Sequence, residues 1–149
     1  NTTAILNDYA FAVINSTESR VNPTSLPGLG NFKKGDTAYA FGYPQASPFN
    51  GNELVYSFGP TSTDPYSGNL TWKLASTLTG GASGGPWYSG YSNGNNVGTV
   101  GSVNSYKYTT DKNSMYGPQF SSSTTALFDA AKLATCPVST TISCVEFSK

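Results

Sequence analysis

Gly80-Gly81-Ala82-Ser83-Gly84-Gly85-Pro86 is the stretch of this 149-residue sequence on which the interpretation of the rest depends. Four glycines surround one serine, and glycine adopts backbone conformations that other residues rarely reach. Such a backbone can turn neighbouring N–H groups toward one point, where they stabilise the oxyanion formed when a serine attacks a carbonyl. The stretch therefore predicts a nucleophile at Ser83 and an oxyanion hole made by the amides of Gly81 and Ser83. A plain glycine-rich turn between two strands is the alternative.

Short apolar segments separated by turn residues fill the first two-thirds of the chain. Segment 9–14 is apolar and compact, which is the pattern of a strand buried on both faces. Segment 53–58 alternates in the way that a half-exposed strand does. Strands of this length with turns between them indicate an all-β antiparallel barrel or sandwich. The expected strands are 9–14, 38–43, 53–58, 70–74, 87–88 and 97–103.

One helix is expected, near the end of the chain. Residues 124–133 place apolar side chains at helical spacing, and a run of serine and threonine precedes them. Serine and threonine cap a first helical turn by accepting hydrogen bonds from its free amides. The predicted fold class is therefore all-β with a C-terminal helix.

The composition restricts the partners and the location of the protein. Charged residues make up 11% of the chain and the formal net charge is zero. Nucleic acids and anionic membranes attract clustered lysine and arginine, so neither is an expected partner. No apolar run approaches the ~20 residues that cross a bilayer. Low charge, three Asn-x-Ser/Thr sequons and a first residue other than methionine predict a processed, secreted, glycosylated extracellular protein. The sequons begin at Asn1, Asn15 and Asn69.

Cys136 and Cys144 are the two cysteines of the sequence. A disulfide between them would close a small loop and stabilise the fold by about 2.5 kcal/mol. Pairing with cysteines on another segment is the alternative. Two thiols without any histidine leave at least half of the usual zinc ligands missing, so no metal is expected. No organic cofactor is expected either.

Segment 72–88, Trp-Lys-Leu-Ala-Ser-Thr-Leu-Thr-Gly-Gly-Ala-Ser-Gly-Gly-Pro-Trp-Tyr, resembles the nucleophile region of secreted trypsin-like serine peptidases with the chymotrypsin fold. It looks closest to the microbial and fungal branch near the glutamyl endopeptidases. Segment 7–14 resembles the segment that carries the triad aspartate, and segment 35–44 resembles the opening of the second barrel. Segment 103–106, followed by 115–118, resembles the strand that lines the substrate cleft and the loop after it.

The resemblance implies roles for individual residues. Ser83 would be the nucleophile, and Asp8 would orient the catalytic imidazole and stabilise its positive charge. For Asp8, a turn or capping aspartate before a strand is the alternative. Thr77 would lie at the base of the pocket for the substrate side chain. Three residues would pair with the substrate backbone: Ser102, Val103 and Asn104.

The resemblance also implies a division of the chain and one missing part. Residues 1–30 would end the N-terminal barrel and form the linker, 31–123 would be the second barrel, and 124–149 the helix and the disulfide-bridged tail. The sequence contains no histidine. In the family the histidine precedes the aspartate, so we expect a separate N-terminal chain of the same precursor to supply it. Because losing this histidine costs about a million-fold in turnover, the chain alone is expected to be inactive.

Two alternatives to a peptidase acting on peptides or proteins remain open. The first is an inactive protease-like scaffold that binds a carbohydrate or a protein, with Trp87, Tyr88 and Tyr91 as a stacking platform for sugars. For these three aromatic residues, packing in the barrel core or beside a cleft is the alternative. The second is a secreted inhibitor or interaction protein.

Ala82 is a further departure from the family pattern, because animal digestive relatives carry an acid there that orders the oxyanion hole. An activation mechanism that uses such an acid is therefore not expected.

Overall fold

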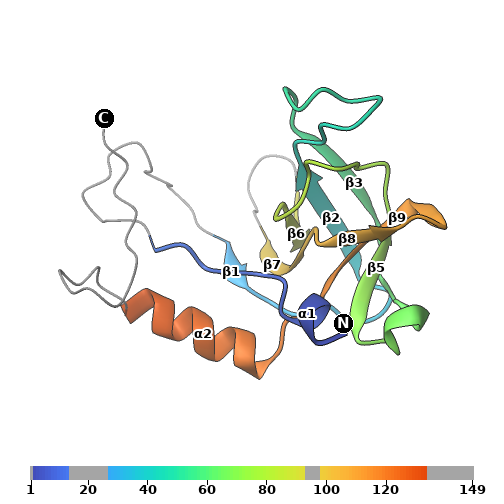
Figure 1. Ribbon diagram of the computed structural model, residues 1–149. Coiled ribbons are helices and arrows are strands. Elements are labelled where there is room, and N and C mark those ends of the chain that lie inside the picture. Colours follow the sequence, from blue (N-terminus) through green and yellow to red (C-terminus); the bar gives the residue numbers. More distant parts are fainter. Residues whose placement is uncertain (1, 14–26, 93–97, 134–149) are drawn as a thin grey trace, which may run out of the picture.

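The computed structural model describes residues 2–13, 27–92 and 98–133 (Figure 1). Strands dominate the described residues, and a helix ends them, so the predicted all-β class with a C-terminal helix is confirmed. The elements in chain order are α1 (Thr2–Leu6), β1 (Gly28–Leu29), β2 (Thr37–Gly42), β3 (Val55–Pro60), β4 (Ser62–Thr63), the 3₁₀ turn η1 (Pro65–Ser67), β5 (Thr71–Ala75), β6 (Pro86–Ser89), β7 (Thr99–Val103), β8 (Tyr106–Tyr108), β9 (Asp111–Pro118) and α2 (Ser122–Leu133).

Two sheets form the body of the described structure. One has the order β1-β7-β6-β2-β3 and the other the order β4-β5-β9-β8. All pairs are antiparallel except β1 with β7, which is parallel. Strands β3 and β5 bring the two sheets into contact. In Figure 1 the sheets wrap around one another at one end of the molecule, and α2 extends away at the other.

The core lies between the two sheets and is built from alternate residues of the strands. Ala38 and Ala40 of β2 are fully buried, and these small side chains leave room for the fully buried indole of Trp87. Leu74 of β5 and Met115 of β9 face the same interior. Strand β3 alternates between half-buried and exposed residues, as predicted for 53–58, although it begins two residues later. The expected strands at 38–43, 70–74, 87–88 and 97–103 correspond to β2, β5, β6 and β7, and Val97 lies outside the described residues.

The predicted strand at 9–14 is wrong for the described residues 9–13, which form no regular element. The rings of Tyr9 and Phe11 pack against Phe120 and Phe128, both with centroids 5.3 Å apart, whereas Val13 is 54% exposed. The apolar character of the segment therefore comes from ring contacts with α2 and the residues before it. It does not come from burial between two neighbouring strands.

The loop expected at 115–118 is also wrong. These residues form the second half of β9, are buried throughout, and pair with β5. Gly117 fits there because a Cβ would collide with the carbonyl oxygen of Val103 and the hydroxyl of Ser102. Strand β9 lies between β5 and β8 in the second sheet, so residues 115–118 are part of the core.

Helix α2 confirms the predicted helix at 124–133 and begins two residues earlier. Thr124 is fully buried, and its Oγ1 accepts a hydrogen bond of 2.9 Å from the amide of Ser121. The Thr125 amide donates to the Ser121 carbonyl at 3.1 Å. A side chain three residues into a helix that satisfies the capping residue's amide is half of a capping box. None of the helices in the described residues is long and apolar enough to cross a membrane.

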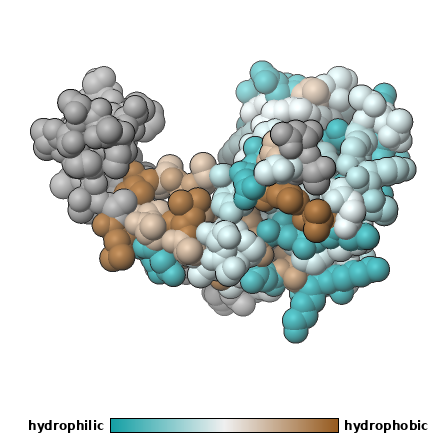
Figure 2. All heavy atoms as spheres, turned by 60° about the horizontal axis from the view of Figure 1, so that its bottom comes forward, coloured by the Kyte–Doolittle hydropathy of each residue, from teal (hydrophilic) through white to brown (hydrophobic). Residues whose placement is uncertain are grey.

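An open apolar groove of about 150 Å³ separates α2 from the edge of the first sheet. Its walls include Tyr9, Phe11, Leu29, Val103, Phe120 and Phe128. Two leucines of α2 add to the apolar surface, since Leu127 is 48% and Leu133 85% exposed. Figure 2 shows hydrophobic surface in this part of the molecule. The groove begins at Tyr9, so it lies beside Asp8 in the sequence.

Leu74→Ala is expected to lower the free energy of unfolding by about 3 kcal/mol, because it leaves a cavity in a fully buried site. The matched control is Leu54→Ala, since Leu54 is 56% exposed and its loss should change stability by about 0.5 kcal/mol or less. Urea unfolding followed by tryptophan fluorescence measures both. Equal losses for the two variants would contradict this placement of the core.

Candidate active site

Ser83 lies in the exposed turn between β5 and β6. Two of the surrounding glycines have positive φ angles, 99° at Gly81 and 79° at Gly84, which other residues rarely adopt. A Cβ on Gly81 would also lie 2.7 Å from the backbone nitrogen of Gln45. At Gly85 a Cβ would collide with the carbonyl oxygen of Phe41. The glycines therefore let the turn bend sharply and lie directly against the end of β2, with Ser83 exposed.

The amides of this turn fall into two groups. Those of Ala82, Gly84 and Gly85 donate hydrogen bonds to the carbonyls of Thr79, Asn104 and Ala82, at 3.2, 2.8 and 3.1 Å. Within the described part of the chain, the amides of Gly80, Gly81 and Ser83 have no such acceptor. Two of these three, Gly81 and Ser83, are the groups predicted to form the oxyanion hole. All three residues are exposed.

The side chain of Asn104 holds the turn in place. It is 1% exposed, and its Nδ2 donates to the carbonyls of Phe41 and Ala82 at 2.8 and 2.9 Å. Its Oδ1 accepts a hydrogen bond of 2.7 Å from the Trp87 indole, and its backbone N–H donates to the Gly85 carbonyl at 2.8 Å. One residue thus fastens the turn to β2, to β6 and to the end of β7.

Asp8 lies next to this same strand end. Its Oδ2 accepts a hydrogen bond of 2.6 Å from the hydroxyl of Ser105, the residue after Asn104. The amide of Ser105 in turn donates to the Tyr116 carbonyl at 2.9 Å, which fixes Ser105 on β9. The structure therefore connects Asp8 to the Ser83 turn through two consecutive residues. Ser105 was not identified from the sequence, because a lone serine after a strand carries no local signal.

The residues predicted to bind substrate have different surroundings. Thr77 is exposed, and its amide donates to the Ser57 hydroxyl at 3.2 Å. Ser102 is fully buried in β7 and donates to the Pro118 carbonyl at 2.8 Å, while Val103 lines the apolar groove. The hydrogen bonds of Thr77, Ser102 and Asn104 are therefore all made to other residues of this chain. The substrate-binding roles of the four residues stay predictions.

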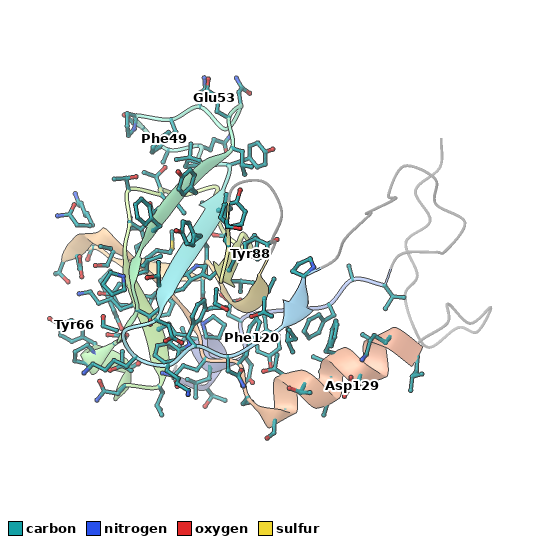
Figure 3. All side chains as sticks on the ribbon, turned by 180° about the vertical axis from the view of Figure 1, so that it is seen from behind. Phe49, Glu53, Tyr66, Tyr88, Phe120 and Asp129 are labelled. Atoms are coloured by element: carbon teal, nitrogen blue, oxygen red, sulfur yellow. The ribbon has the colours of Figure 1, made fainter. Side chains whose placement is uncertain are left out.

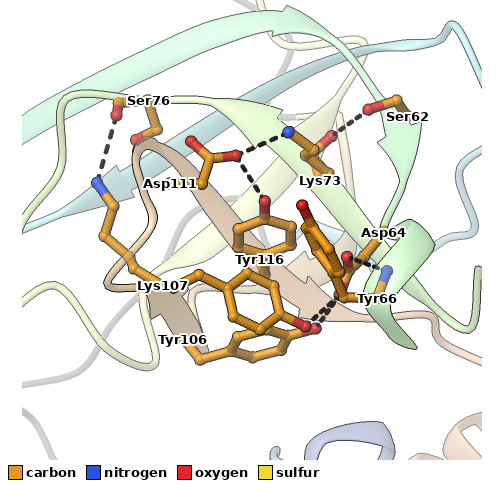
Figure 4. Close-up of polar contacts among 10 residues, drawn as sticks. Ser62, Asp64, Tyr66, Lys73, Ser76, Tyr106, Lys107, Asp111 and Tyr116 are labelled. Atoms are coloured by element: carbon orange, nitrogen blue, oxygen red, sulfur yellow. Dashed lines mark hydrogen bonds and ion pairs between the residues drawn. The ribbon is translucent and has the colours of Figure 1, made fainter. Parts of the chain in front are cut away.

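A half-buried ammonium group lies close to this region. Lys107 Nζ donates to the carbonyl of Leu78 at 2.6 Å. It also donates to the carbonyl of Ser76 at 3.4 Å (Figure 4). Burial lowers the pKa of Lys107 below its ordinary value. These bonds tie β8 to the stretch that leads into the nucleophile turn.

The neighbouring acids have structural contacts. Lys73 donates to Asp111 at 2.7 Å, and the same carboxylate accepts from the Tyr116 hydroxyl at 2.7 Å (Figure 4). The hydrogen bond from Lys73 holds the pKa of Asp111 well below its usual range, and the same bond raises the pKa of Lys73.

Asp64 is fully buried and accepts hydrogen bonds of 2.9 and 2.8 Å from the hydroxyls of Tyr106 and Tyr108. Its other oxygen accepts from the Tyr66 amide at 2.9 Å. Burial raises the pKa of both Tyr106 and Tyr108, so these phenols stay protonated donors. In the described ranges, no group of three or more histidine, cysteine, aspartate or glutamate residues is placed to hold a metal ion.

The remaining sequence-predicted sites are only partly covered by the structure. Trp87 is fully buried, so the suggested platform for sugars cannot include it. Asn69 is exposed, with φ 67°, and its side-chain oxygen accepts a hydrogen bond of 2.7 Å from Thr63. The other predicted sites, Asn1, Asn15, Cys136 and Cys144, lie outside the described residues.

Comparison with known proteins gives two informative structural neighbours. No family model and no curated protein matches the sequence. The protease Anisep from Arthrobacter nicotinovorans is 37% identical over 72% of this chain and 49% of its own, with a TM-score of 0.65. The thermostable serine protease AL20 from an extremophilic microorganism is 38% identical over 75% of this chain and 50% of its own, also with a TM-score of 0.65. The chain thus spans about half the length of each. The fold is chymotrypsin-like, as predicted, and the chain has a serine-protease-like scaffold.

Asn104→Asp is expected to lower the free energy of unfolding by about 3 kcal/mol, because a carboxylate oxygen would face the two carbonyls that now accept from Nδ2. The matched control is Asn113→Asp on the exposed part of β9, which should change stability by about 0.5 kcal/mol or less. Thermal unfolding measures the difference. If Asn104→Asp unfolds with the midpoint of the control, the proposed role of Asn104 is wrong.

Proposed function

We propose that this chain is the nucleophile-bearing part of a secreted, trypsin-like serine endopeptidase, of the microbial and fungal branch near the glutamyl endopeptidases. The observation that carries the proposal is the geometry of the turn around Ser83. Ser83 is exposed, and its own amide and that of Gly81 are two of the three amides of the turn that lack an acceptor in the described chain. The similarity to the protease Anisep and to the serine protease AL20 supports the same reaction class.

Each residue has a defined part in the proposed reaction. The oxygen of Ser83 attacks the carbonyl carbon of a peptide bond while its proton passes to an imidazole nitrogen. The oxyanion formed in this step accepts hydrogen bonds from Gly81 and Ser83. The imidazolium then protonates the leaving amine, and an acyl-enzyme remains on Ser83 until water hydrolyses it. Asp8, held by Ser105, orients the imidazole and stabilises its charge.

The imidazole in this proposal comes from polypeptide outside the 149 residues, as an N-terminal chain of the same precursor. Two observations support this. The sequence contains no histidine, and the part of this chain that matches covers only 49% and 50% of the two neighbouring proteases. The apolar groove that begins at Tyr9 offers a surface where such a polypeptide can pack beside Asp8. No cofactor is needed for this chemistry.

An inactive protease-like scaffold with a binding role is the second candidate. The missing histidine favours it, because a serine without a base retains only about 10³–10⁴-fold acceleration over water. The two candidates differ in one chemical property. A peptidase presents an activated Ser83 hydroxyl, whereas a scaffold presents an ordinary alcohol.

A fluorophosphonate probe is expected to label the protein as isolated, and Ser83→Ala is expected to abolish both labelling and peptide hydrolysis. The matched control is Ser123→Ala, an exposed serine of α2, which should be labelled like the wild type. Mass spectrometry of the labelled peptide locates the modified residue. Hydrolysis that survives in Ser83→Ala would overturn the assignment.

A second polypeptide is expected to accompany the active protein, because the reaction needs a histidine that this chain lacks. Intact mass measured under non-denaturing conditions should exceed the mass of this chain by that of the missing part. Residues 1–149 produced alone should show activity lower by about a million-fold. Full labelling and turnover by residues 1–149 alone would show that another residue acts as the base.

A further inference from the structure

Six aromatic rings form a continuous surface on the outer face of the first sheet. They come from three neighbouring strands and the residues just after β6: Tyr39, Phe41, Tyr56, Phe58, Tyr88 and Tyr91. We call these six residues the aromatic face. Figure 3, in which Tyr88 is labelled, shows ring side chains lying over β2 and β3.

The register of the strands explains the aromatic face. Tyr39 is paired with Phe58 on one side and with Tyr88 on the other, and Phe41 is paired with Tyr56. Because side chains alternate along a strand, Ala38, Ala40 and Trp87 point into the core and the rings point outward. The ring pairs Tyr39–Phe58 and Phe41–Tyr56 are nearly parallel, at 11° and 29°, with centroids 5.4 and 5.3 Å apart.

The aromatic face is partly exposed, and its strands are uncharged. Tyr56 is 50% and Phe58 62% exposed, and the other four residues are half-buried. Large apolar side chains that are exposed together usually mark a binding surface. Strands β2, β3 and β6 contain no aspartate, glutamate, lysine or arginine. An offset pair of rings leaves part of each ring face uncovered. The face therefore presents ring surfaces and phenol hydroxyls, and no formal charge.

These properties select the chemistry of the ligand. Single-stranded nucleic acids also stack on aromatic rings, but they require lysine or arginine beside them for the phosphates. An aliphatic ligand requires a concave pocket, whereas these rings stand on an open sheet face. A neutral sugar ring needs neither a positive charge nor a concave pocket, so it suits this surface. Its C–H groups carry partial positive charge and pack on the electron-rich ring faces, while its hydroxyls bond to the phenols at their rims.

We propose that the aromatic face binds a neutral polysaccharide. The proposal does not depend on the peptidase proposal. It would hold the protein on an uncharged glycan while another part of the molecule acts. It replaces the platform suggested from the sequence, because Trp87 is buried and the rings of β2 and β3 extend the surface of Tyr88 and Tyr91 instead.

Co-sedimentation with insoluble cellulose, chitin and a β-1,3-glucan tests the proposal on the protein as isolated, after inactivation with the fluorophosphonate probe. At least one of the three neutral polymers should retain the protein, and polygalacturonate, an anionic polymer, should not. Phe58→Ala and Tyr56→Ala should each weaken binding by about tenfold, since each removes one ring surface. The control Tyr66→Ala, which changes a tyrosine that is 76% exposed and outside the aromatic face, should bind like the wild type.

Three results would overturn the proposal. The first is that none of the three polymers retains the protein. The second is retention that Phe58→Ala and Tyr56→Ala leave unchanged while their unfolding midpoints match that of the wild type. The third is a change in sedimentation coefficient caused by these two substitutions, which would show that the face contacts a protein or a second copy of the chain.

Discussion

The buried amide of Asn104 determines where the reactive turn lies. Its side chain makes three hydrogen bonds, to Phe41, Ala82 and Trp87, and its backbone makes two more to the glycines after Ser83. Water cannot replace these bonds at a site that is 1% exposed, so the amide fits in one orientation only. The turn therefore cannot shift relative to β2 and β6 without leaving buried polar groups unsatisfied. The position of the exposed Ser83 thus depends on the buried side chain of Asn104.

The side chains of β2 and β6 alternate between the core and the outer face of the first sheet. Small inward residues of β2 make room for the indole of Trp87, which in turn supplies the donor for Asn104. The outward residues of the same strands are rings. Because the period of a strand is two, a slip of one residue in the register would bury the rings and expose the alanines. Core packing, the position of the turn and the aromatic face are consequently fixed by one register.

Local signals in the sequence predicted the parts of the fold that depend on local chemistry. Alternation located β3, helical spacing located α2, and glycines located the turn around Ser83. Signals that depend on distant partners were misread. Segment 9–13 is apolar because its rings meet α2 and the residues before it, and 115–118, expected to be a loop from the resemblance, pairs with β5. The roles of Asn104 and Ser105 could not be predicted, because their partners lie on segments far away in the chain.

The contact between Tyr9 and Thr124 joins the two ends of the described chain. Thr124 donates a hydrogen bond of 2.9 Å to the Tyr9 hydroxyl while its own oxygen accepts from the amide that begins α2. Fraying of the first turn of α2 and release of the segment that carries Asp8 thereby become one cooperative opening event. Amide protons in the two regions would then exchange with solvent at linked rates. Any polypeptide that covers either region would slow exchange in both.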